Sequence, residues 1–94
     1  MWLKKNIPMA TYITTVRLRE ALPADFDKLD FEMAKVRFVP VGQMQTDELV
    51  PYAKYSLKTS LSLPKVIAAA YLIARSIGKN YSLTVTKSME LMAG

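Results

Sequence analysis

The feature that most constrains this chain of 94 residues is a strand followed by a helix, a pattern that occurs twice. Polar residues alternate with β-branched and aromatic residues from about Ala10 to Leu18, which predicts a strand, and a helix is expected to open at Pro23. In the second occurrence of the pattern, a strand is expected over Pro51–Leu61, followed by a helix that begins near Leu63. This repeated plan limits the chain to folds that combine a sheet with two helices.

Both helices are indicated by apolar residues three and four positions apart. In the first helix this stripe consists of Phe26, Leu29, Met33 and Val36. In the second it is broader and consists of Leu63, Val66, Ile67, Ala70, Ile73, Ala74 and Ile77. Ser62 is expected to cap the start of the second helix, and Gly78 is expected to take the left-handed conformation that ends it.

A short strand is expected to close each half. Arg37–Val41 is predicted to lie at a sheet edge, because Pro40 has no N–H for a second neighbour, and Gly42–Val50 is expected to be a mobile connection. The last strand starts at Tyr81 and alternates apolar residues with hydroxyls. The order β-α-β-β-α-β predicts an α+β fold, a ferredoxin-like two-layer sandwich whose four-stranded antiparallel sheet carries both helices on one face.

The length predicts one domain over residues 9–88, with a flexible N-terminal tail over 1–8 and a frayed C-terminus over 89–94. The longest apolar run, Val66–Ile73, is much shorter than the roughly 20 residues of a membrane span, and the start lacks the apolar segment of a secretory signal. We therefore expect a cytoplasmic protein without a membrane span. A hydrophobic content of 51% is high for so small a monomer, which makes a homodimer one expectation.

The absence of cysteine and histidine excludes disulfides, thiolate nucleophiles, Ser-His-Asp chemistry and histidine-ligated zinc. Three isolated glycines do not form a phosphate-binding loop, so no nucleotide cofactor is expected. Asp27 and Asp30 lie three residues apart on the first helix and could share a Mg²⁺ ion, but a solvated helix flank explains them more simply. We expect no metal and no cofactor.

Charge is the strong asymmetry of the chain. The net charge is +5, yet four of the eight acidic residues crowd the first helix, and none lies between Leu49 and Met89. The uncovered face of the predicted sheet would carry Arg17, Lys54 and Lys58, with Arg19 and Lys87 at strand ends. These five residues are our candidates for phosphate contacts with RNA.

Other interpretations of that face stay open. It could be a solvated sheet surface, or a subunit interface with Ile13 as its apolar centre. Specific stacking of bases is not expected, because the outward positions of the central strands hold few aromatic residues and Tyr52 is the one candidate. Binding of the nucleic-acid backbone is compatible with these residues.

Two segments carry a resemblance to a known family. They are Thr11–Leu18, followed by Asp25-Phe26-Asp27-Lys28-Leu29 and Met33, and the closing stretch Ser76–Lys87. Over residues 9–88 the chain resembles the family of the type V antitoxin GhoS. The resemblance implies a ferredoxin-like fold and an RNA-directed endoribonuclease, in a fold group that includes CRISPR-associated nucleases. Those nucleases hold a metal with an aspartate near the end of the first strand, where this chain has Arg17-Leu18-Arg19-Glu20, so no catalytic residue is carried over.

The leading hypothesis is therefore a small RNA-binding regulator that resembles the GhoS-type antitoxins, with endoribonuclease activity left open and its catalytic residues unknown. The alternative is a non-enzymatic interaction module. Such a module would self-associate or bind a protein through its open sheet or an exposed strand edge.

Overall fold

Six elements follow the predicted order in the computed structural model, which describes residues 9–44 and 51–88. They are β1 (Ala10–Leu18), α1 (Pro23–Lys35), β2 (Val39–Met44), β3 (Tyr52–Thr59), α2 (Leu63–Ser76) and β4 (Tyr81–Ser88). The predictions for the regions 1–8 and 89–94 and for most of Gly42–Val50 fall outside the described residues.

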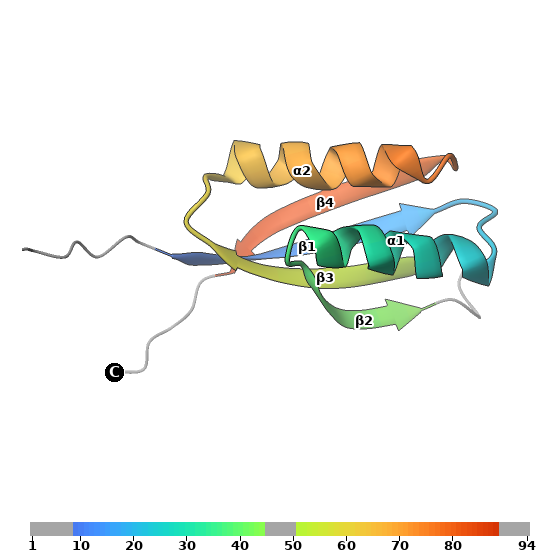
Figure 1. Ribbon diagram of the computed structural model, residues 1–94, viewed down its shortest axis with the longest axis horizontal. Helices are drawn as coiled ribbons and strands as arrows, with labels where there is room; N and C mark the ends of the chain where they lie inside the picture. The colour runs from blue at the N-terminus through green and yellow to red at the C-terminus, as the bar shows by residue number, and fades with distance from the viewer. Residues whose placement is uncertain (1–8, 45–50, 89–94) are drawn as a thin grey trace, which may run out of the picture.

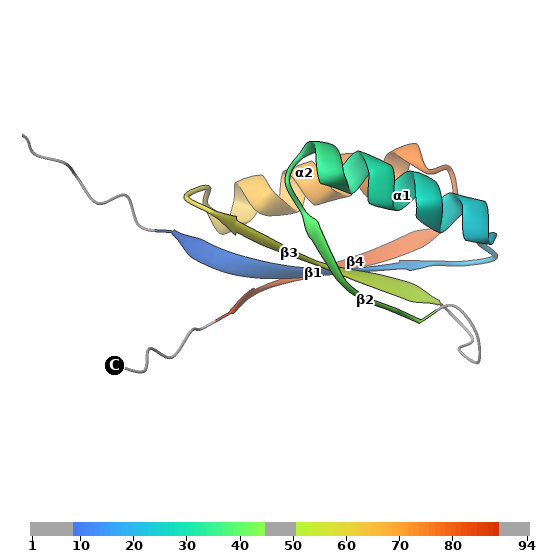
Figure 2. The ribbon, with the colours of Figure 1, turned by 60° about the horizontal axis from the view of Figure 1, so that its bottom comes forward.

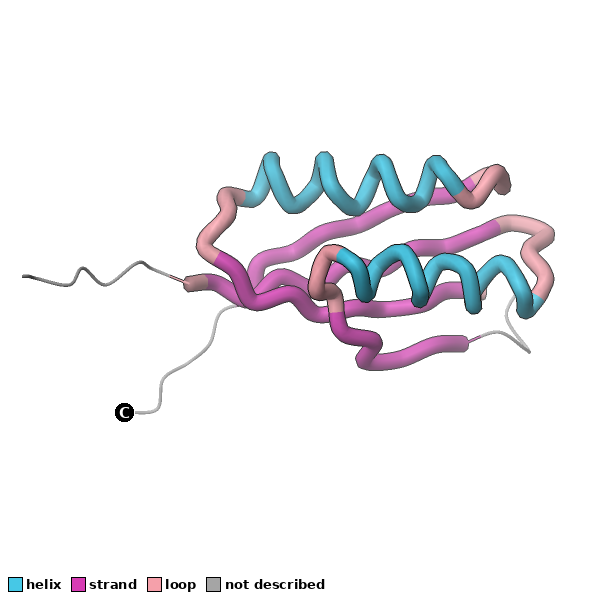
Figure 3. The backbone as a smooth tube through the Cα atoms, in the orientation of Figure 1, coloured by secondary structure: helices cyan, strands magenta, loops and turns pink. Residues whose placement is uncertain are grey.

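The four strands form one antiparallel sheet in the order β2-β3-β1-β4. Both helices lie on the same face of this sheet, and the other face is uncovered (Figures 1, 2 and 3). β1 and β3 are the central strands and β2 and β4 are the edges, so the ferredoxin-like two-layer sandwich and the edge position of Pro40 are confirmed.

The core lies between the sheet and the helices, because the strand alternation points one set of side chains toward the helical layer. From β1 and β3 this set includes Tyr12, Val16, Leu18, Ala53, Tyr55 and Leu57. From the helices it includes Phe26, Leu29, Met33, Val66, Ala70 and Ala74. The two predicted helical stripes thus supply most of the core. β4 contributes less, since Tyr81, Leu83 and Val85 are only half-buried.

The end of α1 differs from the sequence prediction. Phe38 and Arg37 donate their N–H groups to the carbonyls of Met33 and Ala34, at 3.1 and 3.0 Å, and Arg37 has a φ of 75°. These two bonds form a Schellman motif with Arg37 at the left-handed position that glycine usually occupies. The motif uses two of the residues predicted to begin the second strand. β2 therefore begins at Val39 and extends to Met44 after a register shift between Pro40 and Gly42.

α2 begins and ends as predicted, and Gly78 has a φ of 87°. Ser62 holds the N-cap position, although its side chain makes no capping hydrogen bond. One flank of the helix is less covered than its apolar stripe predicted, because Leu63 and Ile67 are exposed. Tyr71 is 45% exposed on the same flank.

Neither helix in the described parts of the chain is long and apolar enough to cross a membrane.

Candidate functional site

The uncovered face of the sheet brings side chains of three strands into rows. The antiparallel register aligns one residue from β3, one from β1 and one from β4 in each row. The four rows are Tyr52–Arg17–Ser82, Lys54–Thr15–Thr84, Ser56–Ile13–Thr86 and Lys58–Thr11–Ser88. Eight of these twelve residues are Ser, Thr or Tyr, three are basic and one is apolar. We call this surface the open face.

A compact cluster of two cations and one aromatic ring forms one end of the open face. The Arg17 guanidinium lies 5.0 Å from the centre of the Tyr52 ring, and the Lys54 ammonium lies 5.9 Å from the same centre. Arg17 and Tyr52 are directly opposite each other on β1 and β3. The ring attracts both cations through its π electrons, which restrains two otherwise flexible side chains.

The other predicted basic residues of this side lie at the two ends of the sheet. Lys58 is exposed and occupies the same strand face as Lys54, about 13 Å farther along β3. Arg19 lies just beyond β1, where its N–H donates to the carbonyl of Asn80 at 2.9 Å. Arg17 and Arg19 together line a small pocket of about 160 Å³ with Asn80, Tyr81 and Ser82. The structure thus groups four of the five candidate residues around the open face.

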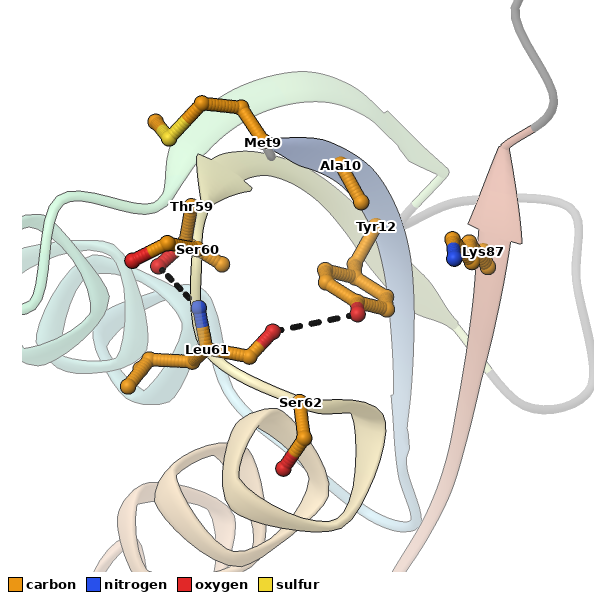
Figure 4. A pocket seen from close by; sticks show the side chains of 8 residues that line it. All are labelled: Met9, Ala10, Tyr12, Thr59, Ser60, Leu61, Ser62 and Lys87. Carbon is orange, nitrogen blue, oxygen red and sulfur yellow. Dashed lines mark hydrogen bonds between the residues drawn. The ribbon is translucent and has the colours of Figure 1, made fainter. Parts of the chain in front are cut away.

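Lys87 does not belong to this group. It is opposite Tyr12, whose side chain points to the core, so strand alternation turns Lys87 toward the helical side of the sheet. There it lines a separate pocket of about 290 Å³ at the junction of β3 and α2 (Figure 4). The same alternation was readable in the sequence, because Lys87 has the parity of the inward-facing Leu83 and Val85.

Two polar side chains of that pocket hold the connection between β3 and α2. The Tyr12 hydroxyl donates to the carbonyl of Leu61 at 3.1 Å, and the Leu61 N–H donates to the hydroxyl oxygen of Thr59 at 3.1 Å. Figure 4 shows both hydrogen bonds as dashed lines between residues that line the pocket. The Tyr12 and Thr59 hydroxyls therefore stabilise the fold through these hydrogen bonds.

Acidic side chains of the described residues are concentrated away from the open face. Those of α1 (Asp25, Asp27, Asp30 and Glu32) belong to the helical layer on the opposite side of the sheet. Asp25 pairs with Lys79 at 3.4 Å, and Glu32 pairs with Lys35 at 3.3 Å. The four rows of the open face therefore carry positive charge and no acidic residue, and among the described residues Glu20, which follows Arg19, is the one acid outside α1.

In the described part of the chain no group of three potential metal ligands is found, on α1 or elsewhere. Asp30 instead accepts a hydrogen bond from the Tyr55 hydroxyl at 2.5 Å. Burial and this carboxylate together raise the pKa of Tyr55 well above its usual value near 10, so the phenol stays protonated at neutral pH. Both groups therefore stabilise the contact between helix and sheet.

Comparison with known proteins identifies the fold and nothing narrower. The chain is similar to the solved structure of the uncharacterized protein TM1266 from Thermotoga maritima, with a TM-score of 0.59 and 14% sequence identity. The match covers 85% of this chain and 98% of that one. No protein-family model and no curated protein matches the sequence. At this identity the likeness confirms the fold, and function must be argued from the open face.

The sequence indicates Tyr52 as the aromatic candidate of this face, but it does not predict that Arg17 and Lys54 both contact the ring. Charge and strand parity predict the two cations, whereas their shared contact with Tyr52 depends on the register between β1 and β3. Parity alone does not determine which residues of two strands lie opposite each other.

Proposed function

We propose that the open face binds single-stranded RNA mainly through its phosphate backbone. The observation that supports this most strongly is that the open face carries basic residues and no acidic one, whereas the helical side mixes both charges. Arg17, Lys54 and Lys58 project from the open face, whereas the acidic residues of α1 belong to the opposite layer. On the open face a polyanion therefore meets cations without the repulsion of a carboxylate in the same rows.

The composition of the rows supports contacts to phosphate rather than sequence readout. Ser56 lies between Lys54 and Lys58 on β3, and Thr15 and Thr84 share the row of Lys54, so their hydroxyls can donate to phosphate oxygens near the cations. Tyr52 is the single aromatic side chain on the described open face, so at most one base has a stacking platform. We therefore expect binding that depends strongly on salt and weakly on sequence.

The link to GhoS-type antitoxins stays a prediction from the resemblance. It adds endoribonuclease activity to the proposal, without a residue assigned to it. A binding experiment with and without EDTA separates the two parts, because a cleaved strand shows catalysis and a retarded intact strand shows binding alone.

The test compares two double variants that lower the net charge equally. Lys54→Glu/Lys58→Glu changes the open face, and Lys28→Glu/Lys65→Glu changes exposed lysines of α1 and α2. The affinity for a fluorescent single-stranded RNA is measured by anisotropy as salt rises. We expect the first variant to lose binding and the second to retain most of it. For the wild type, the logarithm of the binding constant should fall linearly with the logarithm of the salt concentration, with a slope of about −0.7 for each phosphate contact.

Equal loss in both variants would show that net charge matters and the open face does not. Absence of wild-type binding at low salt would refute the proposal. The remaining candidate function would then be the interaction module, whose test is whether Ile13→Asp on the open face abolishes self-association.

A further inference from the structure

The two edges of the sheet are protected to very different degrees. β2 carries Pro40, which has no N–H, and a register shift between Pro40 and Gly42. Both features discourage pairing with another strand. β4 has eight residues, no proline, no register irregularity against β1, and no charged residue before Lys87. Within the described part of the chain, no strand pairs with its outer side.

The hydrogen-bonding groups on this edge can be assigned from the ladder. The Arg19 N–H donates to the carbonyl of Asn80, so this opposed pair is of the hydrogen-bonded type. Because the two types alternate along antiparallel strands, Arg17–Ser82 and Thr15–Thr84 are also hydrogen-bonded pairs. The N–H and C=O groups of the odd-numbered residues therefore point outward, and these residues are Tyr81, Leu83, Val85 and Lys87.

The uncovered flank of α2 lies above the same edge. Leu63, Ile67 and Tyr71 are spaced by four residues, which places them on one side of the helix, and they are 36%, 40% and 45% exposed. The Tyr71 ring packs edge-on against Tyr81 of β4 at 5.8 Å, which fixes this side as the one beside the strand. Figure 1 shows α2 lying alongside β4, so the exposed apolar residues of the helix accompany an unpaired strand.

We propose that β4 pairs antiparallel with β4 of a second copy of this chain, across a two-fold axis at Thr84. This register places Leu83 opposite Val85 of the second copy and Tyr81 opposite its Lys87. All the outward backbone groups are then paired, apolar side chains meet apolar side chains, and each lysine faces an aromatic ring. The α2 flanks of the two copies come to lie along the same seam.

Side-chain pairing selects this register over its neighbours. An axis at Leu83 would place Lys87 of the second copy opposite Lys79, which lies before the start of β4, so that lysine would lose the aromatic partner and meet a like charge that is already paired with Asp25. An axis at Val85 would place Leu83 opposite Lys87 and leave Tyr81 opposite a residue beyond the end of β4. The axis at Thr84 avoids both mismatches. The proposal concerns the β4 edge and does not depend on RNA binding by the open face.

Single cysteines test the register directly, because the chain contains no other cysteine. At the axis, Thr84 forms a non-hydrogen-bonded pair with its own copy, whose Cα atoms lie about 4.5 Å apart, within the range of a disulfide. The corresponding distance for Thr86 is about 14 Å, since the two residues are offset by four positions on neighbouring strands. Both side chains are exposed, so Thr84→Cys and Thr86→Cys should fold alike.

The wild-type mass is measured by light scattering without RNA, and each cysteine variant is oxidised mildly and separated on a non-reducing gel. We expect a dimer, with Thr84→Cys cross-linking about ten times faster than Thr86→Cys or more. We also expect Thr84→Lys to yield a folded monomer by circular dichroism, and Thr86→Lys to remain dimeric. A monomeric wild type at about 100 μM, or equal cross-linking of the two cysteine variants, would overturn the proposal.

Discussion

The Tyr55 hydroxyl on β3 donates a 2.5 Å hydrogen bond to the Asp30 carboxylate on α1, and this bond joins the central sheet to the first helix. A hydrogen bond to a charged acceptor contributes more than a neutral one. The contact explains why a tyrosine occupies a fully buried core position. It also assigns Asp30 a structural role, whereas charge patterning suggested only a solvated flank or a magnesium ligand.

Tyr55→Phe is expected to lower the free energy of unfolding by about 1.5–3 kcal/mol, because the hydroxyl and its bond to a carboxylate are lost. The matched control is Tyr12→Phe, which removes the bond to the Leu61 carbonyl and should cost about 0.5–1.5 kcal/mol. Urea denaturation of the three proteins measures the difference. Equal costs would contradict the special contribution of Asp30.

The raised pKa of Tyr55 also predicts how the stability of the fold changes at alkaline pH. When the pKa of a group is higher in the folded state than in the unfolded state, the group contributes its full stabilisation at a pH below the unfolded pKa, which is near 10 for tyrosine. This contribution decreases as the pH rises above that value. Wild-type stability should therefore fall above pH 10 more steeply than that of Tyr55→Phe. Parallel pH profiles of the two proteins would refute this assignment.

Asp25 gives a prediction at acidic pH. Its carboxylate accepts the N–H of Leu22 at 2.8 Å and pairs with Lys79, and these contacts lower its pKa below 3.8. A lowered pKa stabilises the fold fully above 3.8, and the contribution is lost as the pH falls through the folded value. An NMR titration should place this carboxyl below 3.8. Asp25→Asn should show a shallower acid loss of stability than the wild type.

Arg37→Gly is expected to stabilise the protein by about 0.5–1 kcal/mol. Arg37 has a φ of 75°, a conformation that costs an ordinary residue about 1–2 kcal/mol, part of which is offset by the greater freedom of glycine when unfolded. The control is Lys35→Gly in the last turn of α1, which should destabilise by about 1 kcal/mol. In thermal denaturation, the midpoint of Arg37→Gly should be higher than that of the wild type, and the midpoint of Lys35→Gly should be lower.

Thr14→Val is expected to raise the free energy of unfolding by about 1 kcal/mol. The Thr14 hydroxyl is fully buried and has no hydrogen-bond partner in the described regions, so valine keeps the shape and removes an unsatisfied polar atom. Thr15→Val on the open face serves as control and should change stability by less than about 0.5 kcal/mol. A destabilised Thr14→Val protein would show that the hydroxyl is satisfied in solution.

Tyr52→Leu is expected to weaken RNA binding by about two- to five-fold, because an exposed cation–π contact contributes about 0.5–1 kcal/mol and two cations lose their support. Tyr52→Phe retains the ring and should bind like the wild type. Anisotropy titrations at one salt concentration distinguish the two. If Tyr52→Phe is as weak as Tyr52→Leu, the hydroxyl rather than the ring holds the cations.

The order of elements and both helical stripes were predictable, because periods of two and near 3.6 depend only on spacing along the chain. The end of α1 was not, since Arg37 occupies a position where sequence reasoning looks for glycine. Placement of Arg17, Lys54 and Lys58 on one face followed from alternation. Their arrangement around Tyr52 required the register of the sheet, which is set by packing and loop geometry far from these residues.

If the open face binds RNA as proposed, the concentration of acidic residues on α1 would make that binding one-sided. A bound molecule would turn the helical layer outward, where the carboxylates of α1 lie among the basic residues of the two helices, and this mixed surface would attract a second strand less. Pairing through β4 preserves this property, because a two-fold axis perpendicular to the sheet leaves both open faces on the same side. Such a protein would coat a single strand and keep it dispersed, and it would be poorly suited to bridging strands into a condensate.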